Sequence, residues 1–196
     1  MEYLLTVITF FPLLAVLLML FIPREEEQTI KRMAVGLSFI PLLLAIYLWL
    51  AYDQAAGGFQ FEHTAAWIPV IKVNYHVGVD GLSVPLIFLT ALLTTLCMIY
   101  SSFTIKKRVK EFFLLFFLLQ MGMVGVFVAL DLVLFYVFWE IGLVPMYLLI
   151  GIWGQEKDRP QYSAIKFFLY TLAGSVLMLL AILAVYFYAG TFDIIR

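Results

Sequence analysis

Long apolar stretches follow one another along nearly the whole chain, separated by short polar segments. A helix needs about 20 apolar residues to cross a bilayer. Stretches of that kind lie at 3–22, 33–51, 82–103, 112–130, 132–153 and 162–189. Only Asp131 marks the boundary between the fourth and the fifth. A tight turn is expected there, because one helix of about forty residues would be too long for the membrane. The pattern predicts an all-α integral membrane fold with about six transmembrane helices.

The segment 52–81 is the sizeable piece between these stretches. Its residues 59–63 read Phe-Gln-Phe-Glu-His and alternate between apolar and polar, which favours a short strand and a hairpin. Asp80 precedes the third stretch and is placed to cap its helix, with a position at the mouth of a channel as the alternative. The chain thus divides into two transmembrane helices (1–51), an outer loop with a possible β-hairpin (52–81) and transmembrane helices three to six (82–196).

Composition agrees with a membrane protein. Hydrophobic residues make up 65% and charged residues 13% of the 196-residue chain, whereas a soluble domain has roughly 45–50% and about 25%. The net charge of −1 gives no reason to expect a nucleic-acid partner. Cys97 is the single cysteine, which excludes an internal disulfide and a cysteine-ligated iron–sulfur cluster. We expect it to be a small buried apolar residue.

Basic residues are distributed unevenly between the two sides of the predicted membrane. Nine of the twelve lie in the first, third and fifth connections, while the opposite side holds only Lys72 and Arg196. Because loops rich in lysine and arginine stay in the cytoplasm, the asymmetry predicts that both ends of this segment lie on the outer side. No basic residue precedes the first stretch, so we expect a retained anchor rather than a cleaved signal peptide.

Glu140 is an acidic residue in the middle of the fifth stretch, about nine residues or roughly 12–14 Å from its outer end. A charged side chain at the centre of a membrane helix costs about 2.5–3.5 kcal/mol on insertion scales, so it points to function by default. Burial favours the neutral carboxyl, and a nearby ammonium favours the carboxylate. We predict that Glu140 takes up and releases a proton or an ion. The alternative is a permanently protonated side chain that links two helices.

Two further residues belong to this prediction. Pro145 leaves the carbonyl of Ile141 without its helical hydrogen bond, which would suit either ordered water on a proton path or a packing kink. Lys166 lies about five residues into the sixth stretch and differs in depth from Glu140 by about 10 Å. A direct salt bridge is therefore not expected. Lys166 would act through water or through another lysine, or would extend its ammonium to the membrane interface.

Several familiar kinds of site are missing from the sequence. His63 and His76 both lie in the outer segment, so no apolar stretch offers a histidine for haem. No nucleotide-binding glycine motif, HExxH sequence or pair of cysteines is present. We expect this chain to bind neither a cofactor nor a metal.

The residues around Glu140 carry a family resemblance. The runs DLVLFYVFWEIGLVPMYLLIGIWG at 131–154 and RPQYSAIKFFLYTLAGS at 159–175, with GVDGLSVP at 78–85, resemble the antiporter-like subunits of respiratory complex I, the NADH-quinone oxidoreductase. LVPMYLLIGIWG and AIKFFLYT are most similar to the M-type subunit, or chain 4. Subunits of Mrp-type cation/proton antiporters share much of the pattern. The resemblance covers essentially the whole chain, as the N-terminal portion of a fold with two inverted repeats.

The resemblance implies a proton-translocating subunit without prosthetic groups, serving quinone reduction elsewhere in a complex. Glu140 matches the family's central glutamate, Lys166 matches a lysine on the same water-connected path, and Asp131 matches an acid of weaker role. NADH, flavin, iron–sulfur clusters and quinone are expected in partner subunits. The expected partners are other membrane subunits, including neighbouring antiporter-like ones, and the lipid bilayer. A bacterial plasma (inner) membrane is the expected location.

Two other readings stay open at this point. One is a cation/proton antiporter subunit of the Mrp type, which would have no redox partner. The other is a structural or assembly fragment in which Glu140 never changes its protonation. Because the family's seventh-helix lysine and second repeat have no counterpart here, we do not expect these residues to pump protons alone.

Overall fold

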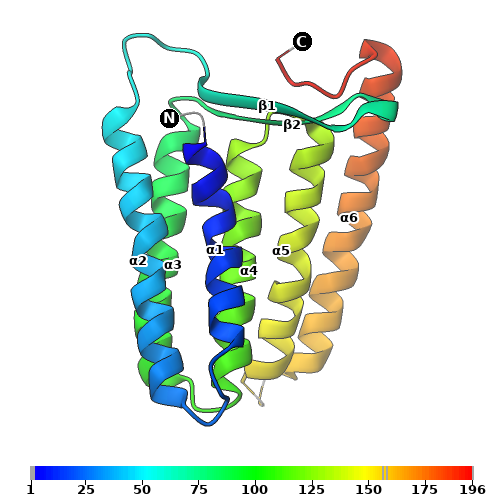
Figure 1. The fold of residues 1–196 in the computed structure, drawn as a ribbon. Helices are drawn as coiled ribbons and strands as arrows, with labels where there is room; N and C mark the ends of the chain where they lie inside the picture. The colour runs from blue at the N-terminus through cyan, green and yellow to red at the C-terminus, as the bar shows by residue number, and fades with distance from the viewer. Residues whose placement is uncertain (1–2, 156, 158, 196) are drawn as a thin grey trace.

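The computed structural model describes residues 3–155, 157 and 159–195. Within these ranges, long helices stand side by side, and a two-stranded hairpin lies across one end of them (Figure 1). The elements in chain order are α1 (Leu4–Leu20), α2 (Glu27–Ala51), β1 (Gln60–Ile68), the 3₁₀ turn η1 (Pro69–Ile71), β2 (Val73–Val79), α3 (Ser83–Thr104), α4 (Val109–Val128), α5 (Leu132–Trp153) and α6 (Pro160–Ala189).

The predicted helical membrane fold with a hairpin is confirmed. Helices α2 to α6 are each long and apolar enough to cross a membrane, while α1 is a shorter apolar helix of 17 residues. Helix α2 begins at Glu27 rather than at residue 33, because the hydrophobic pattern marks only its apolar part and misses its polar first turns. Helix α4 ends at Val128 and α5 begins at Leu132, so the expected turn at Asp131 is present.

The N-terminus, the hairpin and the segment after α6 all lie at one end of the bundle, called the hairpin end below (Figure 1). This arrangement agrees with the prediction that both ends of the segment lie on the same side. Arg196, which that prediction counted, lies outside the described residues. The assignment of the hairpin end to the outer side stays a prediction.

The hairpin is antiparallel and packs on the helices through β2. Val73, Val77 and Val79 of β2 are fully buried, whereas most of β1 is exposed. Beyond β2, the carboxylate of Asp80 accepts hydrogen bonds from the backbone amides of Leu82 and Ser83, at 3.1 and 2.7 Å. The predicted cap at the start of α3 is thereby confirmed.

The core is formed mainly by α1 to α4 and the inner face of β2. One apolar cluster lies toward the hairpin end, and a second joins α1, α2, α3 and α4 farther away. Helix α6 is different, because it packs chiefly against α5 and stands at the edge of the bundle (Figure 1). Only 11% of its most apolar window is buried, so α6 has a broad apolar face that these residues leave uncovered.

Helices α4 and α5 approach so closely that their backbones touch. A Cβ atom added to Gly122 would lie 2.9 Å from the backbone nitrogen of Gly142 and 3.0 Å from the carbonyl oxygen of Phe138. One turn along, Gly125 faces the ring of Phe138. Small residues allow such contact in membranes, where packing rather than the hydrophobic effect holds helices together. The pair fixes the position of α5, which carries Glu140.

Gly122→Ala should therefore destabilise the fold. The added methyl group meets backbone atoms, which cannot swing aside as a side chain can, and overpacking of this kind costs typically 1–3 kcal/mol, an order-of-magnitude figure. Gly174→Ala is the matched control, since nothing lies within 4 Å of the added Cβ in α6. Thermal unfolding in detergent should show a lower midpoint for Gly122→Ala alone. Equal midpoints for the two variants would contradict the close contact.

Candidate functional site

Glu140 lies on α5, eight residues after the helix begins, at a depth of about 12 Å from the hairpin end. Its side chain is half-buried, and its Oε1 is buried without a hydrogen-bond partner among the described residues. A buried polar atom without a partner is costly and calls for an explanation. The carboxyl is therefore the one acidic group within the described spans that is both deep and incompletely satisfied.

The phenol of Tyr136 lies beside this carboxyl, and the hydroxyl of Ser175 lies beside the phenol. The phenol of Tyr136, one helical turn before Glu140 on α5, interacts with the Glu140 carboxyl and with Ser175 of α6. Ser175 is buried, and its hydroxyl also donates to the carbonyl of Leu172 at 3.1 Å. Hydroxyl groups both donate and accept hydrogen bonds. The three side chains thus form a small polar group at the contact between α5 and α6.

Asp131 fixes where α5 begins. Its buried carboxylate accepts hydrogen bonds from the backbone amides of Val133 and Leu134, at 2.9 and 3.2 Å, which is the arrangement of an N-cap. Its second oxygen accepts from the amide of Asn74 in β2, at 3.2 Å. The structure therefore gives Asp131 a capping and tethering role, and a part in proton transfer stays a prediction.

Pro145 and Lys166 occupy less informative places. Helix α5 continues through Pro145, which is buried, in agreement with the packing alternative. Lys166 is exposed on the side of α6, and among the described residues no ion pair joins it to Glu140. The expectation that the two residues form no direct salt bridge agrees with this arrangement. Their coupling through water stays a prediction.

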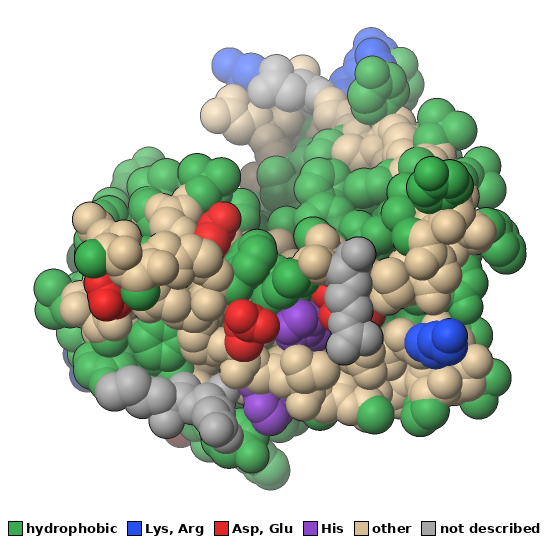
Figure 2. All heavy atoms as spheres, turned by 90° about the horizontal axis from the view of Figure 1, so that it is seen from above, with side chains coloured by type: hydrophobic (Ala, Val, Ile, Leu, Met, Phe, Trp, Pro, Cys, Tyr) green, Lys and Arg blue, Asp and Glu red, His purple; other side chains and the backbone are tan. Residues whose placement is uncertain are grey.

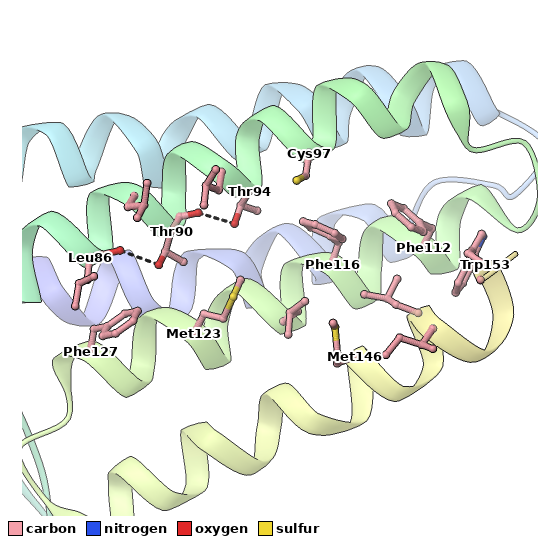
Figure 3. Close-up of a pocket in the computed structure, with 16 residues that line it drawn as sticks. Leu86, Thr90, Thr94, Cys97, Phe112, Phe116, Met123, Phe127, Met146 and Trp153 are labelled. Carbon is pink, nitrogen blue, oxygen red and sulfur yellow. Dashed lines mark hydrogen bonds between the residues drawn. The ribbon is translucent and has the colours of Figure 1, made fainter. Parts of the chain in front are cut away.

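An apolar cleft of about 580 Å³ runs between α3, α4 and α5 (Figure 3). The hydroxyls of Thr90 and Thr94 on its wall are satisfied by carbonyls of their own helix, at 2.8 and 2.7 Å. Cys97 lines the same cleft and is exposed, so the expected burial was wrong. The residues that line the cleft are mostly apolar and none is charged. We assign no proton-transfer role to it.

The residues that the structure describes contain no group of three or more histidine, cysteine, aspartate or glutamate side chains that could hold a metal ion. The polar group at Glu140 consists of a carboxyl and two hydroxyls. Such a group can hold and pass a proton.

Known proteins share this fold and these motifs. The family described as NADH:quinone oxidoreductase/Mrp antiporter, TM, matches residues 129–196, the part that contains α5 and α6. NADH-quinone oxidoreductase subunit M of Rhodobacter capsulatus is 45% identical over 199 aligned positions, which cover 100% of this chain and 38% of that protein. The chain belongs to the family of antiporter-like membrane subunits. NADH-ubiquinone oxidoreductase chain 4 of Marchantia polymorpha is 38% identical over 93% of the chain and 37% of its own length.

Solved structures agree with this membership. A chain of respiratory complex I from Thermus thermophilus superposes with a TM-score of 0.82 and 28% identity, over 96% of this chain and 38% of that one. A chain of the Mrp complex from Dietzia sp. shares the fold, with a TM-score of 0.74 and 22% identity over 98% of this chain and 20% of its own. This antiporter-like chain thus spans well under half the length of the relatives that it matches.

Sequence reasoning missed Tyr136, the neighbour of Glu140, and Ser175, which contacts Tyr136. Tyr136 could have been found, because residues four apart share one face of a helix. Ser175 could not, because its contact depends on how the antiporter-like chain packs α6 against α5.

The contributions of Asp131 and Asp80 to the stability of the fold should depend on pH in opposite directions. Burial raises the pKa of Asp131, and the nearby Asp193 adds to that rise, so the stability due to Asp131 should fall as the pH rises above about 3.9. Hydrogen bonding from the amide of Ser83 lowers the pKa of Asp80, so its contribution should be lost as the pH falls below that value.

Thermal unfolding between about pH 3 and pH 6 checks this pair. Asparagine keeps an N-cap, so Asp131→Asn should remove the decline at higher pH, and Asp80→Asn should remove the loss at lower pH. The same change of slope in both variants would contradict the assignment.

Proposed function

We propose that this chain is part of a proton-translocating membrane subunit of a respiratory NADH-quinone oxidoreductase, and that protons pass through Glu140. The observation that carries the proposal is the buried Oε1 of Glu140 at membrane depth, which has no hydrogen-bond partner among the residues that the structure describes. A carboxyl in that position can bind a proton as the neutral acid and lose it when a cation or water approaches. The hydroxyls of Tyr136 and Ser175 offer the next donors and acceptors.

The electrons of such a complex would move elsewhere. We infer that NADH, flavin, iron–sulfur clusters and quinone belong to partner subunits, and that this chain binds no cofactor. The names of its relatives support this assignment, since they are subunits of quinone oxidoreductases. The chain would act as a translocase component and would not catalyse a reaction alone.

The surroundings of the chain follow from the same proposal. The partners would be further membrane subunits, including other antiporter-like ones, and the uncovered apolar face of α6 supports this. The location would be a bacterial plasma membrane, with the hairpin end outside, as the distribution of basic residues favours. The match to subunit M of Rhodobacter capsulatus over the whole chain supports a bacterial membrane.

A cation/proton antiporter subunit is the second candidate, and the shared fold with the Mrp complex supports it. In that case proton movement would need no electron donor and would depend on Na⁺. Proton release from vesicles on addition of Na⁺, with neither NADH nor quinone present, would favour this candidate over the first.

Glu140→Gln should abolish proton pumping by the intact assembly. Glutamine keeps the shape of the side chain but cannot ionise, so a transfer step that uses the carboxyl should slow by about 100-fold. Pumping is measured by quenching of a pH-sensitive dye in vesicles, and assembly by native gel electrophoresis.

Glu26→Gln is the matched control, since it makes the same chemical change on an exposed residue. It should pump normally. A normal ratio of protons to electrons in Glu140→Gln would refute the proposal.

Lys166→Met should reduce pumping severalfold, while Lys166→Arg should largely keep it, if the positive charge acts on Glu140 through water. Lys157→Met, in the connection between α5 and α6, controls for the loss of a basic residue near the same membrane surface. If Lys166 only extends its ammonium to the membrane interface, the Lys166→Met and Lys157→Met variants will pump protons at the same rate. The measurement is again dye quenching in vesicles, normalised to electron transfer.

A further inference from the structure

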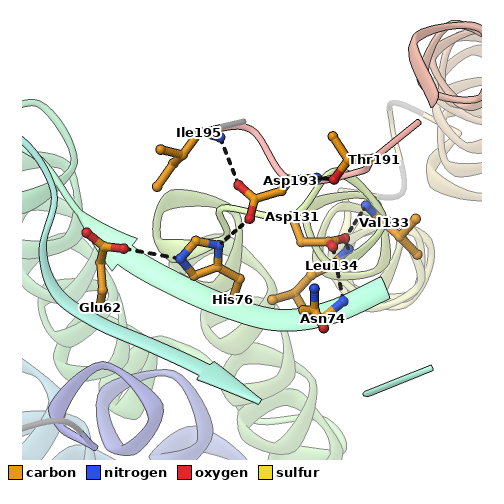
Figure 4. Close-up of polar contacts among 9 residues, drawn as sticks. All are labelled: Glu62, Asn74, His76, Asp131, Val133, Leu134, Thr191, Asp193 and Ile195. Atoms are coloured by element: carbon orange, nitrogen blue, oxygen red, sulfur yellow. Dashed lines mark hydrogen bonds and ion pairs between the residues drawn. The ribbon is translucent and has the colours of Figure 1, made fainter. Parts of the chain in front are cut away.

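The hairpin end contains a histidine enclosed by two carboxylates. The Nε2 atom of His76 lies 3.3 Å from an oxygen of Glu62, and its Nδ1 lies 3.3 Å from an oxygen of Asp193 (Figure 4). The side chain of His76 is only 7% exposed, and Asp193 is 13% exposed. Seen from this end, acidic side chains gather around a histidine (Figure 2).

The three side chains come from parts of the chain that are far apart in sequence. Glu62 belongs to β1, His76 to β2, and Asp193 to the segment that follows α6. A further carboxylate, that of Asp131 before α5, interacts with Asp193. Among the described residues, the ion-pair partners of the imidazole are Glu62 and Asp193, and both are acidic.

Backbone hydrogen bonds also link β2 to the segment after α6, through the turn between α4 and α5. The amide of Leu130 donates to the carbonyl of His76, and the amide of Ile194 donates to the carbonyl of Leu130, both at 2.9 Å. The amide of Leu132 donates to the carbonyl of Phe192, also at 2.9 Å. The turn between α4 and α5 is thus held between β2 and the segment after α6.

The protonation of His76 decides whether both side-chain contacts can form. A neutral imidazole has one N–H and one lone pair, whereas the charged imidazolium has two N–H donors. With carboxylates at both nitrogens, the neutral ring would turn a lone pair toward one anion. Only the imidazolium can donate to Glu62 and Asp193 at the same time. Both contacts therefore form only when His76 is protonated.

We propose that His76, with Glu62 and Asp193, forms a proton-binding latch at the hairpin end, which ties the segment after α6 to the hairpin when His76 is protonated and releases it when the proton leaves. The proton comes from water on that side of the membrane and returns to it. The latch involves none of the residues assigned to proton transfer at Glu140, and it holds whether or not Glu140 moves protons.

Hydrogen–deuterium exchange of the intact assembly tests the latch. The amides of Ile194 and Leu132 report closure, and the start of α3 at the same end serves as reference. After correction for intrinsic exchange, the rate for these amides in the unmodified protein should rise about tenfold from about pH 5 to pH 9, as the ion pair between His76 and Asp193 is lost. In His76→Gln the rate should be high and independent of pH.

Asp193→Asn provides the decisive comparison. In the native protein, Oδ1 of Asp193 accepts from the amide of Ile195 at 2.9 Å, and Oδ2 faces His76. An asparagine that keeps its oxygen toward Ile195 places its NH₂ group against Nδ1, where it can donate to the neutral ring but not to the charged one. Its segment should therefore open as the pH falls, the reverse of the native direction.

A reversed pH dependence in Asp193→Asn supports the latch, since a merely structural contact would not change sign. Two results overturn it. One is a native exchange rate that does not change with pH. The other is an Asp193→Asn rate that changes in the same direction as the native rate. If His76→Gln fails to assemble, the Asp193→Asn comparison still decides the matter.

Discussion

The Asp131 carboxylate is the interaction on which the position of the deep acid depends. Helices α4 and α5 are joined by a turn of three residues, and such a short turn leaves little freedom in where α5 begins. The carboxylate fixes that point by accepting two amides of the first turn of α5 and one of β2. Because a helix advances about 1.5 Å per residue, fixing its first residue also fixes the depth of Glu140.

The glycine contact between α4 and α5 fixes the rotation of the same helix. Gly122 of α4 lies directly against the backbone of Gly142 in α5. A larger side chain at residue 142 would not fit there, so the glycine faces α4. With Gly142 directed at α4, Glu140 stands about 200° around the helix from it. Glu140 therefore turns away from α4, on the face of α5 where Tyr136 contacts Ser175 of α6. Cap and contact together set both the depth and the direction of the carboxyl.

Much of this architecture could be predicted from the sequence, because membrane spans leave a strong local signal. The apolar stretches, the turn at Asp131 and the cap by Asp80 all depend on residues close together in the chain. The start of α2 was misplaced because polar residues before residue 33 are also helical. The contact of Ser175 with Tyr136, and the pairing of His76 with Asp193, join separate elements. The spacing of residues along the sequence does not predict such contacts, because they depend on how the helices pack.

Cys97 has a practical consequence that follows from its place on the wall of the cleft between α3, α4 and α5. These 196 residues carry one thiol, which is exposed and lies on the α3 side of that cleft. A lipophilic fluorophore or spin label attached there would report on whatever covers this wall, helix or acyl chain, with no engineered cysteine needed.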